Sequence, residues 1–404
     1  MLTPYRLIGV TPNARIARTI NDAEAPGPMT QIVIDDEFGP IGPGGIRALM
    51  TAVMGSGPGM KGGPYKLLKS IRVWKSYIGD EGAAAIAEVL RLGGAEVQLT
   101  YLELFDDGVG PKGALALGQS LSAGKNLSLA TLKLDYNTSL GAEGVMSLCR
   151  GLRTNISLME LHLSYCMITY EAGSALAEVL ANAKSALEVL NLTGNRLGGI
   201  GLSAICKGLA VNSKLETFKI ADNLIDQSDE DMQALADFRD CLFNPQSGMA
   251  KIDLMYNRIG EKGALVLAPA LGSDNTKVKE FLVDLTLPMS AFDMIFRRDA
   301  GGKGKKGKKK KSDLRLKKDI QFIRKDDRTG LNIYSFNYID NYVDLESHSA
   351  LSNLAEDEVR TCTTEIGVMA QEVLTAENGK YQRAVVVDED GYYSVDYGLL
   401  GLEM

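Results

Sequence analysis

One sequence pattern recurs along most of this 404-residue chain and constrains its fold more than any other feature. The pattern is apolar-x-apolar-x-x-polar-x-apolar-Gly, and successive copies lie 28 to 34 residues apart. The seven regular copies begin at Ile71, Leu102, Leu132, Leu161, Leu190, Phe218 and Ile252, and a degenerate copy begins at Ile32. Self-similarity at such a period predicts small structural units stacked side by side.

Each copy combines a short strand with a helix. Leu102 and Leu104 alternate with polar residues, which places both apolar side chains on one face of a strand. A glycine follows, and then apolar residues recur at helical spacing, as in Ala83, Ile86 and Leu90. Five copies share this register. We therefore expect an arc with a parallel sheet inside and helices outside.

The sequence from Leu190 to Asn195, LNLTGN, and the glycines at the helix starts resemble leucine-rich repeats of the ribonuclease-inhibitor type. The resemblance covers residues 28 to 296 and implies an α/β horseshoe-shaped solenoid. It also implies that the polar column bonds backbone groups in the turns. That column contains Ser76, Asp107, Asn137, Cys166, Asn195, Asn223 and Asn257. Cys149 and Cys206 fall on the helical stripe, and we expect both to be buried.

Binding in a solenoid depends on side chains of the sheet that point away from the core. Aligning the strands places five aromatic residues there: Trp74, Phe105, Tyr136, Tyr165 and Tyr256. Interfaces favour tryptophan and tyrosine as anchors, so these residues are candidates for binding a protein partner. Packing against neighbouring side chains along the sheet is the alternative, because scattered exposed apolar residues alone indicate little.

Charge is concentrated in one segment. The net charge is −7, yet residues 297 to 318 contain twelve Lys and Arg against two Asp. Residues 297 to 311 are rich in Gly and Lys and predict a flexible linker. Alternatives for Lys303 to Lys311 are a nuclear-localisation signal, contact with nucleic-acid phosphates, or docking on an acidic surface.

Residues 312 to 404 lack the repeat and predict a separate α+β domain. Strand-like runs cover residues 331 to 339, 384 to 387 and 392 to 397, and a short helix is expected over residues 367 to 374. Three ordered blocks, at residues 312 to 320, 367 to 373 and 384 to 397, resemble the endosialidase-type intramolecular chaperone domain. The resemblance implies a trimer that assists assembly of the preceding protein and then cleaves itself.

The same resemblance places a catalytic dyad at Ser312 and Lys317 and the scissile bond between Lys311 and Ser312. A lysine can activate a serine only when its amine is neutral. Its reference pKa of about 10.4 must then be lowered by burial or by nearby positive charge, for which Arg315, Lys318 and Lys311 are candidates. Asp313 is a further supporting candidate.

These observations favour a protein-binding solenoid, preceded by residues 1 to 27, with a single-turnover autoprotease at its C-terminal end. The alternative is an uncleaved scaffold or interaction protein, for example cytoskeletal or ciliary, with an inactive trimerisation domain. Five cysteines without a CxxC pair and two distant histidines indicate neither a disulfide framework nor a metal site. We expect no cofactor, no membrane span and an intracellular, cytoplasmic location, with nuclear, ciliary or virion-associated locations as alternatives.

Overall fold

A computed structural model gives the structure of the chain. It describes residues 29–37, 39–56, 63–93, 96–284, 286–298, 309–311, 317–325, 331–338, 365–369, 372–373, 385–387 and 393–396. The chain divides into two compact units between Asp299 and Ala300. Residues 1 to 27 lie outside the described residues. None of the helices within the ranges above is long and apolar enough to cross a membrane.

The first unit contains a nine-stranded parallel sheet with its strands in chain order. Each of the eight predicted apolar starts is the second residue of its strand, and neighbouring starts pair with each other, as for Ile71 opposite Leu102 and Leu132 opposite Leu161. The ninth strand was not among the predicted copies. The strands are β1 (Gln31–Ile34), β2 (Ser70–Trp74), β3 (Tyr101–Phe105), β4 (Thr131–Lys133), β5 (Glu160–His162), β6 (Val189–Asn191), β7 (Thr217–Lys219), β8 (Lys251–Asp253) and β9 (Glu280–Leu282).

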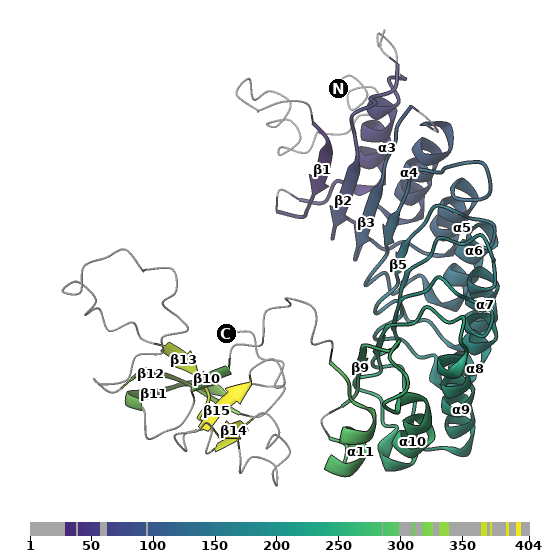
Figure 1. Ribbon diagram of the computed structural model, residues 1–404. Coiled ribbons are helices and arrows are strands. Elements are labelled where there is room, and N and C mark those ends of the chain that lie inside the picture. The colour runs from purple at the N-terminus through teal and green to yellow at the C-terminus, as the bar shows by residue number, and fades with distance from the viewer. Residues whose placement is uncertain are drawn as a thin grey trace, which may run out of the picture. The chain divides into compact units, whose positions relative to one another are not determined.

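Helices cover one face of this sheet, along the outer side of its curve (Figure 1). They are α3 (Gly42–Val53), α4 (Gly79–Gly93), α5 (Pro111–Ser120), α6 (Gly141–Leu152), the 3-10 helix η1 (Tyr170–Ala172), α7 (Gly173–Leu180), α8 (Gly198–Leu209), α9 (Asp229–Phe243), α10 (Gly260–Leu267), the 3-10 helix η2 (Ala268–Leu271) and α11 (Met289–Ile295). The predicted helical stripes are buried between helices and sheet, and so are Cys149 and Cys206. An α/β leucine-rich-repeat solenoid is the resulting architecture.

Helices α5 and α6 approach each other at two glycines. A Cβ atom added to Gly151 would lie 1.8 Å from the carbonyl oxygen of Gly118, and one added to Gly118 would lie 2.6 Å from that of Leu148. Only residues without a side chain permit this backbone contact. The glycines therefore set the spacing between these two repeats.

A ladder of buried side chains joins the turns that follow the strands. Asn137 accepts hydrogen bonds from the amides of Asp107 (3.0 Å) and Val109 (2.9 Å) through Oδ1. Its Nδ2 donates to the carbonyls of Leu104 (2.7 Å) and Leu134 (2.8 Å). Asn195 and Asn257 repeat this arrangement. The predicted structural role of the polar column is thus confirmed.

Asp107 is the acidic member of this ladder. Its Oδ1 accepts from the amide of Ser76 at 2.8 Å, whereas its buried Oδ2 has no hydrogen-bond partner among the described residues. Burial raises the pKa of Asp107 to about 7, opposed by the Ser76 amide and assisted by Asp106. The folded state therefore holds the proton of Asp107 more tightly than the unfolded chain does.

The second unit contains two three-stranded antiparallel sheets. In one sheet the strands lie in the order β10 (Lys309–Lys311), β15 (Tyr393–Asp396) and β14 (Val385–Val387). In the other sheet the order is β11 (Lys317–Lys325), β12 (Asn332–Tyr338) and β13 (Glu365–Gly367). The predicted strand runs overlap β12, β14 and β15. The limits of the linker and the two domains that were drawn from the sequence remain predictions.

Two expectations for this region differ from the structure. Gly367 belongs to a strand rather than a helix, because it pairs with Tyr334 of β12, whereas Glu372 and Val373 are helical, as expected for the later part of that range. Lys309 to Lys311 pair with β15, so these three residues form an edge strand and not a flexible tether. Lysines are compatible with an edge strand, where their charges remain solvated.

The ladder predicts how one substitution changes stability with pH. The pKa of Asp107 is higher in the folded than in the unfolded state. The contribution of Asp107 to the free energy of unfolding is therefore lost as pH rises from about 4 through about 7. Asp107→Asn removes this titration and supplies an amide donor. We expect the variant to be more stable by ~1–3 kcal/mol at pH 8, with the difference vanishing near pH 4, in urea unfolding.

The matched control is the reverse change one repeat later. Asn137→Asp places a carboxylate against the carbonyls of Leu104 and Leu134, and we expect it to lower the free energy of unfolding by ~2–4 kcal/mol at pH 8. Equal and pH-independent effects of the two substitutions would contradict this view of the ladder.

Candidate functional site

The face of the sheet opposite the helices carries the predicted aromatic residues. A column of seven residues, called the rim column below, immediately follows the apolar strand segments: Lys75, Asp106, Tyr136, Tyr165, Gly194, Asp222 and Tyr256. All seven have left-handed backbone, with φ from 50° to 74°. Their amides bond the neighbouring repeat, as from Tyr136 to the Ser164 carbonyl (2.8 Å) and from Tyr165 to the Thr193 carbonyl (2.9 Å). Neighbouring members therefore lie about one strand spacing, ~4.8 Å, apart.

Three of the five predicted aromatics form a continuous stack. The ring centroids of Phe105 and Tyr136 are 4.9 Å apart, and those of Tyr136 and Tyr165 are 4.8 Å apart with planes inclined by only 25°. Tyr136 is 43% exposed and Tyr165 38%. The rings thus pack on one another, as the alternative interpretation expects, and still face solvent, whereas binding of a partner stays a prediction.

Gly194 ends the stack. A Cβ atom on Gly194 would lie 2.2 Å from the ring of Tyr165, so the ring occupies the space that a side chain would fill. The remaining predicted aromatics lie at the two ends of the sheet. Trp74 is half-buried, and Tyr256 lines a hollow of about 400 Å³ together with Arg258 and Asp284.

A charged cluster that the sequence did not reveal lies on strands β2 to β4. The hydroxyl of Tyr101 donates to Glu103 at 2.7 Å, and the same carboxylate lies 3.7 Å from Nε of Arg72. The guanidinium of Arg72 also lies 4.7 Å from the Tyr101 ring centroid, and Lys133 Nζ 5.6 Å from it. Burial, followed by Glu103, raises the pKa of Tyr101. These cations already have partners within the sheet.

His162 of β5 adjoins this cluster. Burial and the nearby Lys133 lower the pKa of His162, against the opposing effect of Glu160, whose Oε2 lies 3.4 Å from Nε2. The imidazole is therefore neutral at neutral pH. Among the described residues, no group of three acidic, histidine or cysteine side chains is placed to hold a metal ion.

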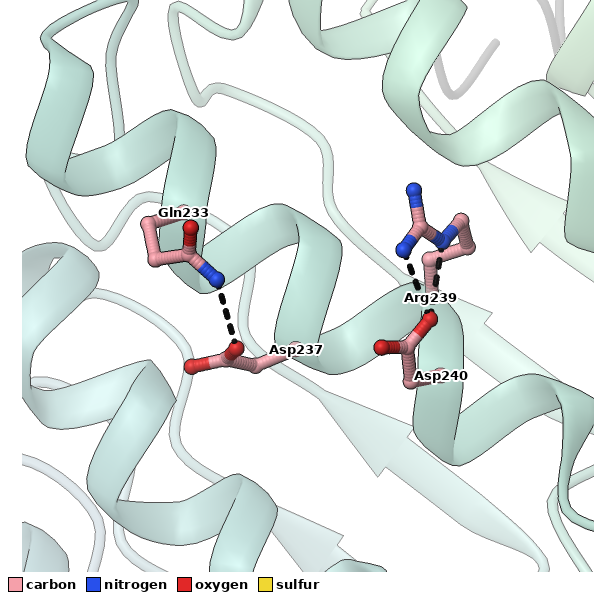
Figure 2. A network of polar contacts seen from close by, with 4 residues as sticks. All are labelled: Gln233, Asp237, Arg239 and Asp240. Atoms are coloured by element: carbon pink, nitrogen blue, oxygen red, sulfur yellow. Dashed lines mark hydrogen bonds and ion pairs between the residues drawn. The ribbon is translucent and has the colours of Figure 1, made fainter.

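The helix layer offers polar contacts of a different kind. Figure 2 shows Gln233 donating to Asp237 at 3.0 Å and Arg239 bonding Asp240 at 2.7 and 2.9 Å, all on α9. The charged side chains of this network bond to one another or to Gln233 on α9, and Asp237 also accepts a hydrogen bond from Ser203 of α8. The network stabilises the outer layer and presents no reactive group.

In the second unit, the structure describes one member of the predicted dyad. The side chain of Lys317 is buried, at 7% exposure, and its Nζ donates to the carbonyl of Val368 at 3.1 Å. The ammonium nitrogen also lies 3.6 Å from the centroid of the Phe336 ring. Ser312, Asp313 and Arg315 lie outside the described residues, as does the side chain of Lys311, whose backbone ends β10.

A polar contact that the sequence did not indicate lies near this lysine. Glu372 accepts a hydrogen bond from the Tyr334 hydroxyl at 2.5 Å and another from Nδ2 of Asn332 at 3.4 Å. The hydrogen bond that Tyr334 donates to Glu372 is the main cause of the raised pKa of Tyr334. The contact joins β12 to the helical residue Glu372, four residues after the carbonyl that Lys317 meets.

Comparison with known proteins locates the repeats independently. A family model described as Leucine Rich repeat matches residues 125–149, 154–177 and 184–206. The NACHT, LRR and PYD domains-containing protein 12 of Mus musculus is 29% identical over 217 residues, which are 52% of this chain and 19% of that protein.

Two ribonuclease inhibitors are also similar. That of Sus scrofa is 28% identical over 215 residues, covering 53% of this chain and 45% of the inhibitor, and that of Mus musculus is 32% identical over 152 residues, covering 36% and 32%. The chain thus spans less than half the length of each relative. Together with the parallel sheet and its asparagine ladder, these matches show that the chain carries leucine-rich repeats of the kind found in ribonuclease inhibitor and NACHT proteins.

Proposed function

We propose that the repeat unit is a protein-binding module whose binding face is the exposed sheet face. The observation that carries this proposal is the half-exposed stack of Phe105, Tyr136 and Tyr165, held at fixed spacing by the backbone ladder. Rigid aromatic side chains lose little conformational entropy on binding and bury a large area, which makes them effective anchors. The relatives named ribonuclease inhibitor act on another protein, and this supports protein binding here.

Selection of peptides from a random library tests this proposal without a known partner. We expect binders of the full chain to lose about tenfold or more in affinity for the Tyr136→Asn/Tyr165→Asn variant, since asparagine keeps the left-handed backbone but removes both rings. Tyr170→Asn is the matched control, because Tyr170 is a similarly exposed tyrosine (48%) in the helix layer. Binders with the same affinity for the wild-type chain and all of these variants would refute the proposal that the exposed sheet face is the binding face.

For residues 312 to 404, we propose a trimeric, self-cleaving domain with Ser312 as nucleophile and Lys317 as base, as the resemblance to the intramolecular chaperones implies. Burial of Lys317 supports this role, because an amine that must accept a proton works best when withdrawn from water. The position of β10 supports it as well, since the scissile bond would directly follow the last residue of an edge strand.

The proposed cleavage needs only groups of this chain and one water molecule. The Ser312 hydroxyl attacks the carbonyl carbon of Lys311 while Lys317 takes the hydroxyl proton. The amide C–N bond breaks, and the amine of Ser312 receives that proton. The resulting ester between Lys311 and the Ser312 oxygen is hydrolysed by water, which releases the two fragments and restores the hydroxyl.

Intact-mass measurement of the purified protein tests the cleavage. We expect two fragments separated between Lys311 and Ser312, and an uncut 404-residue chain for Ser312→Ala and Lys317→Met. Lys325→Met is the matched control and should cleave normally, because Lys325 is an exposed lysine at the other end of β11 and Lys317 retains the base. A wild-type chain that stays intact would overturn the proposal and favour the uncleaved scaffold.

Light scattering of the same samples tests assembly. The proposal predicts that the uncut Ser312→Ala chain is a trimer, and a monomer would contradict the trimeric domain. Binding of nucleic acid or of an acidic surface at Lys303 to Lys311 stays a prediction, with Lys309 to Lys311 placed in an edge strand and the rest of that run outside the described residues.

A further inference from the structure

Carboxylates alternate with the aromatic stack along the rim. Asp106 precedes Tyr136 in the rim column, Asp135 directly precedes Tyr136 in the chain, and Asp222 follows Tyr165 after the gap at Gly194. Within the described residues, none of these three carboxylates has a lysine or arginine nitrogen within 4 Å. Negative charge on this rim is therefore not neutralised by the sheet itself.

The cations on the strands of the same sheet face do not neutralise the negative charge of the rim. Arg72 lies against Glu103 and the Tyr101 ring, and Lys133 faces that ring as well. Both positions are on the strands, two residues or more before the rim column.

The rim column has a cation of its own, Lys75, next to Asp106, and no ion pair of Lys75 is found among the described residues. Asp135 accepts a hydrogen bond from the Ser164 amide at 2.7 Å. From Tyr136 to Asp222, the rim column is acidic and aromatic and contains no cation.

The carboxylates are close enough to the stack to act with it. The pKa of Tyr165 is raised first by burial, next by Tyr136 and then by Asp222. Asp106 and Tyr136 are neighbours in a column whose members lie about one strand spacing, ~4.8 Å, apart. One ligand group of a few ångströms can therefore touch a ring face and a carboxylate at the same time.

A guanidinium group satisfies both kinds of contact. It is planar, stacks on aromatic faces, and donates paired hydrogen bonds to a carboxylate, whereas a lysine ammonium is a compact and strongly hydrated point charge. An acidic ligand would meet the uncompensated charges of Asp106, Asp135 and Asp222. Charge complementarity therefore selects a basic ligand, and the stacked rings select arginine over lysine.

We propose that the rim of the exposed sheet face binds an extended, arginine-bearing segment of a partner protein, with a guanidinium group seated on the face of Tyr165 that Tyr136 leaves uncovered and paired with Asp222, and with Asp106 as a second acidic contact. This inference rests on the proposed role of the exposed sheet face in protein binding and adds the chemistry of the partner. An extended segment fits because the rim presents its groups in a line across successive strands.

Fluorescence anisotropy with three labelled dodecapeptides tests the inference on the full chain. One peptide alternates arginine and glycine, the second has lysine in place of arginine, and the third has glutamate. We expect the arginine peptide to bind about fivefold or more tightly than the lysine peptide, and the glutamate peptide not to bind. Equal binding of the arginine and lysine peptides, or no binding of either, would overturn the proposal.

Variants locate the binding. Asp106→Asn/Asp222→Asn and Tyr165→Asn should each weaken binding of the arginine peptide by about three- to tenfold, and both changes introduce asparagine, which tolerates left-handed backbone. The matched control is Glu230→Gln/Glu261→Gln, which removes two exposed carboxylates from helices α9 and α10 with the same change in net charge. An equal loss in this control would show general charge attraction and contradict a rim site.

The outcomes separate this inference from the function on which it rests. If library-selected binders depend on Tyr136 and Tyr165 but contain no arginine, the binding face stands and the proposed partner chemistry is wrong. If no selected binder depends on those tyrosines, the binding face itself is wrong.

Discussion

The buried side-chain ladder at the strand ends is the interaction on which the rest of the repeat unit depends. Each turn exposes amides and carbonyls that the next repeat covers, and buried backbone groups without partners are costly. Asn137 satisfies four of them in two repeats, through Oδ1 and Nδ2. A single polar side chain per repeat thereby fixes how one strand-turn-helix unit sits on the next.

That ladder also determines the geometry of the exposed sheet face. It holds the turns in place, and the rim column takes left-handed backbone that costs non-glycine residues roughly 1–2 kcal/mol each. The backbone of Tyr136 and Tyr165 is set by these turns rather than by their rings. The rim therefore presents side chains at a fixed pitch, and their chemistry alone distinguishes one part of the rim from another.

Much of the repeat unit could be predicted because its signal is periodic. Strand starts, helical stripes and the polar column all recur at matching positions, and the structure confirms them. Strand β9 was not predicted, because Thr286 replaces the asparagine and Met289 stands where a glycine is expected. The cluster around Arg72 and Tyr101 has no repeated residue type and thus no signal. The stack was predicted as a set of aromatics, but its end at Gly194 depends on space that only the structure shows.

The second unit was harder to predict, because its strands recur with no common period and β10 pairs with the distant β15. Gly367 was assigned to a helix although it pairs with Tyr334, and Lys309 to Lys311 were assigned to a tether although they pair with β15. Lys317 was expected to be catalytic from the resemblance, and its burial against Phe336 and Val368 is a property that no local pattern encodes.

The central claim is that partners bind the rim of the exposed sheet face. Photo-cross-linking of the full chain to a selected peptide, followed by mass spectrometry, tests it most directly. The account predicts cross-links concentrated at residues 105–106, 135–136 and 164–165. Cross-links confined to helices α4 to α10, with none at the rim, would contradict it.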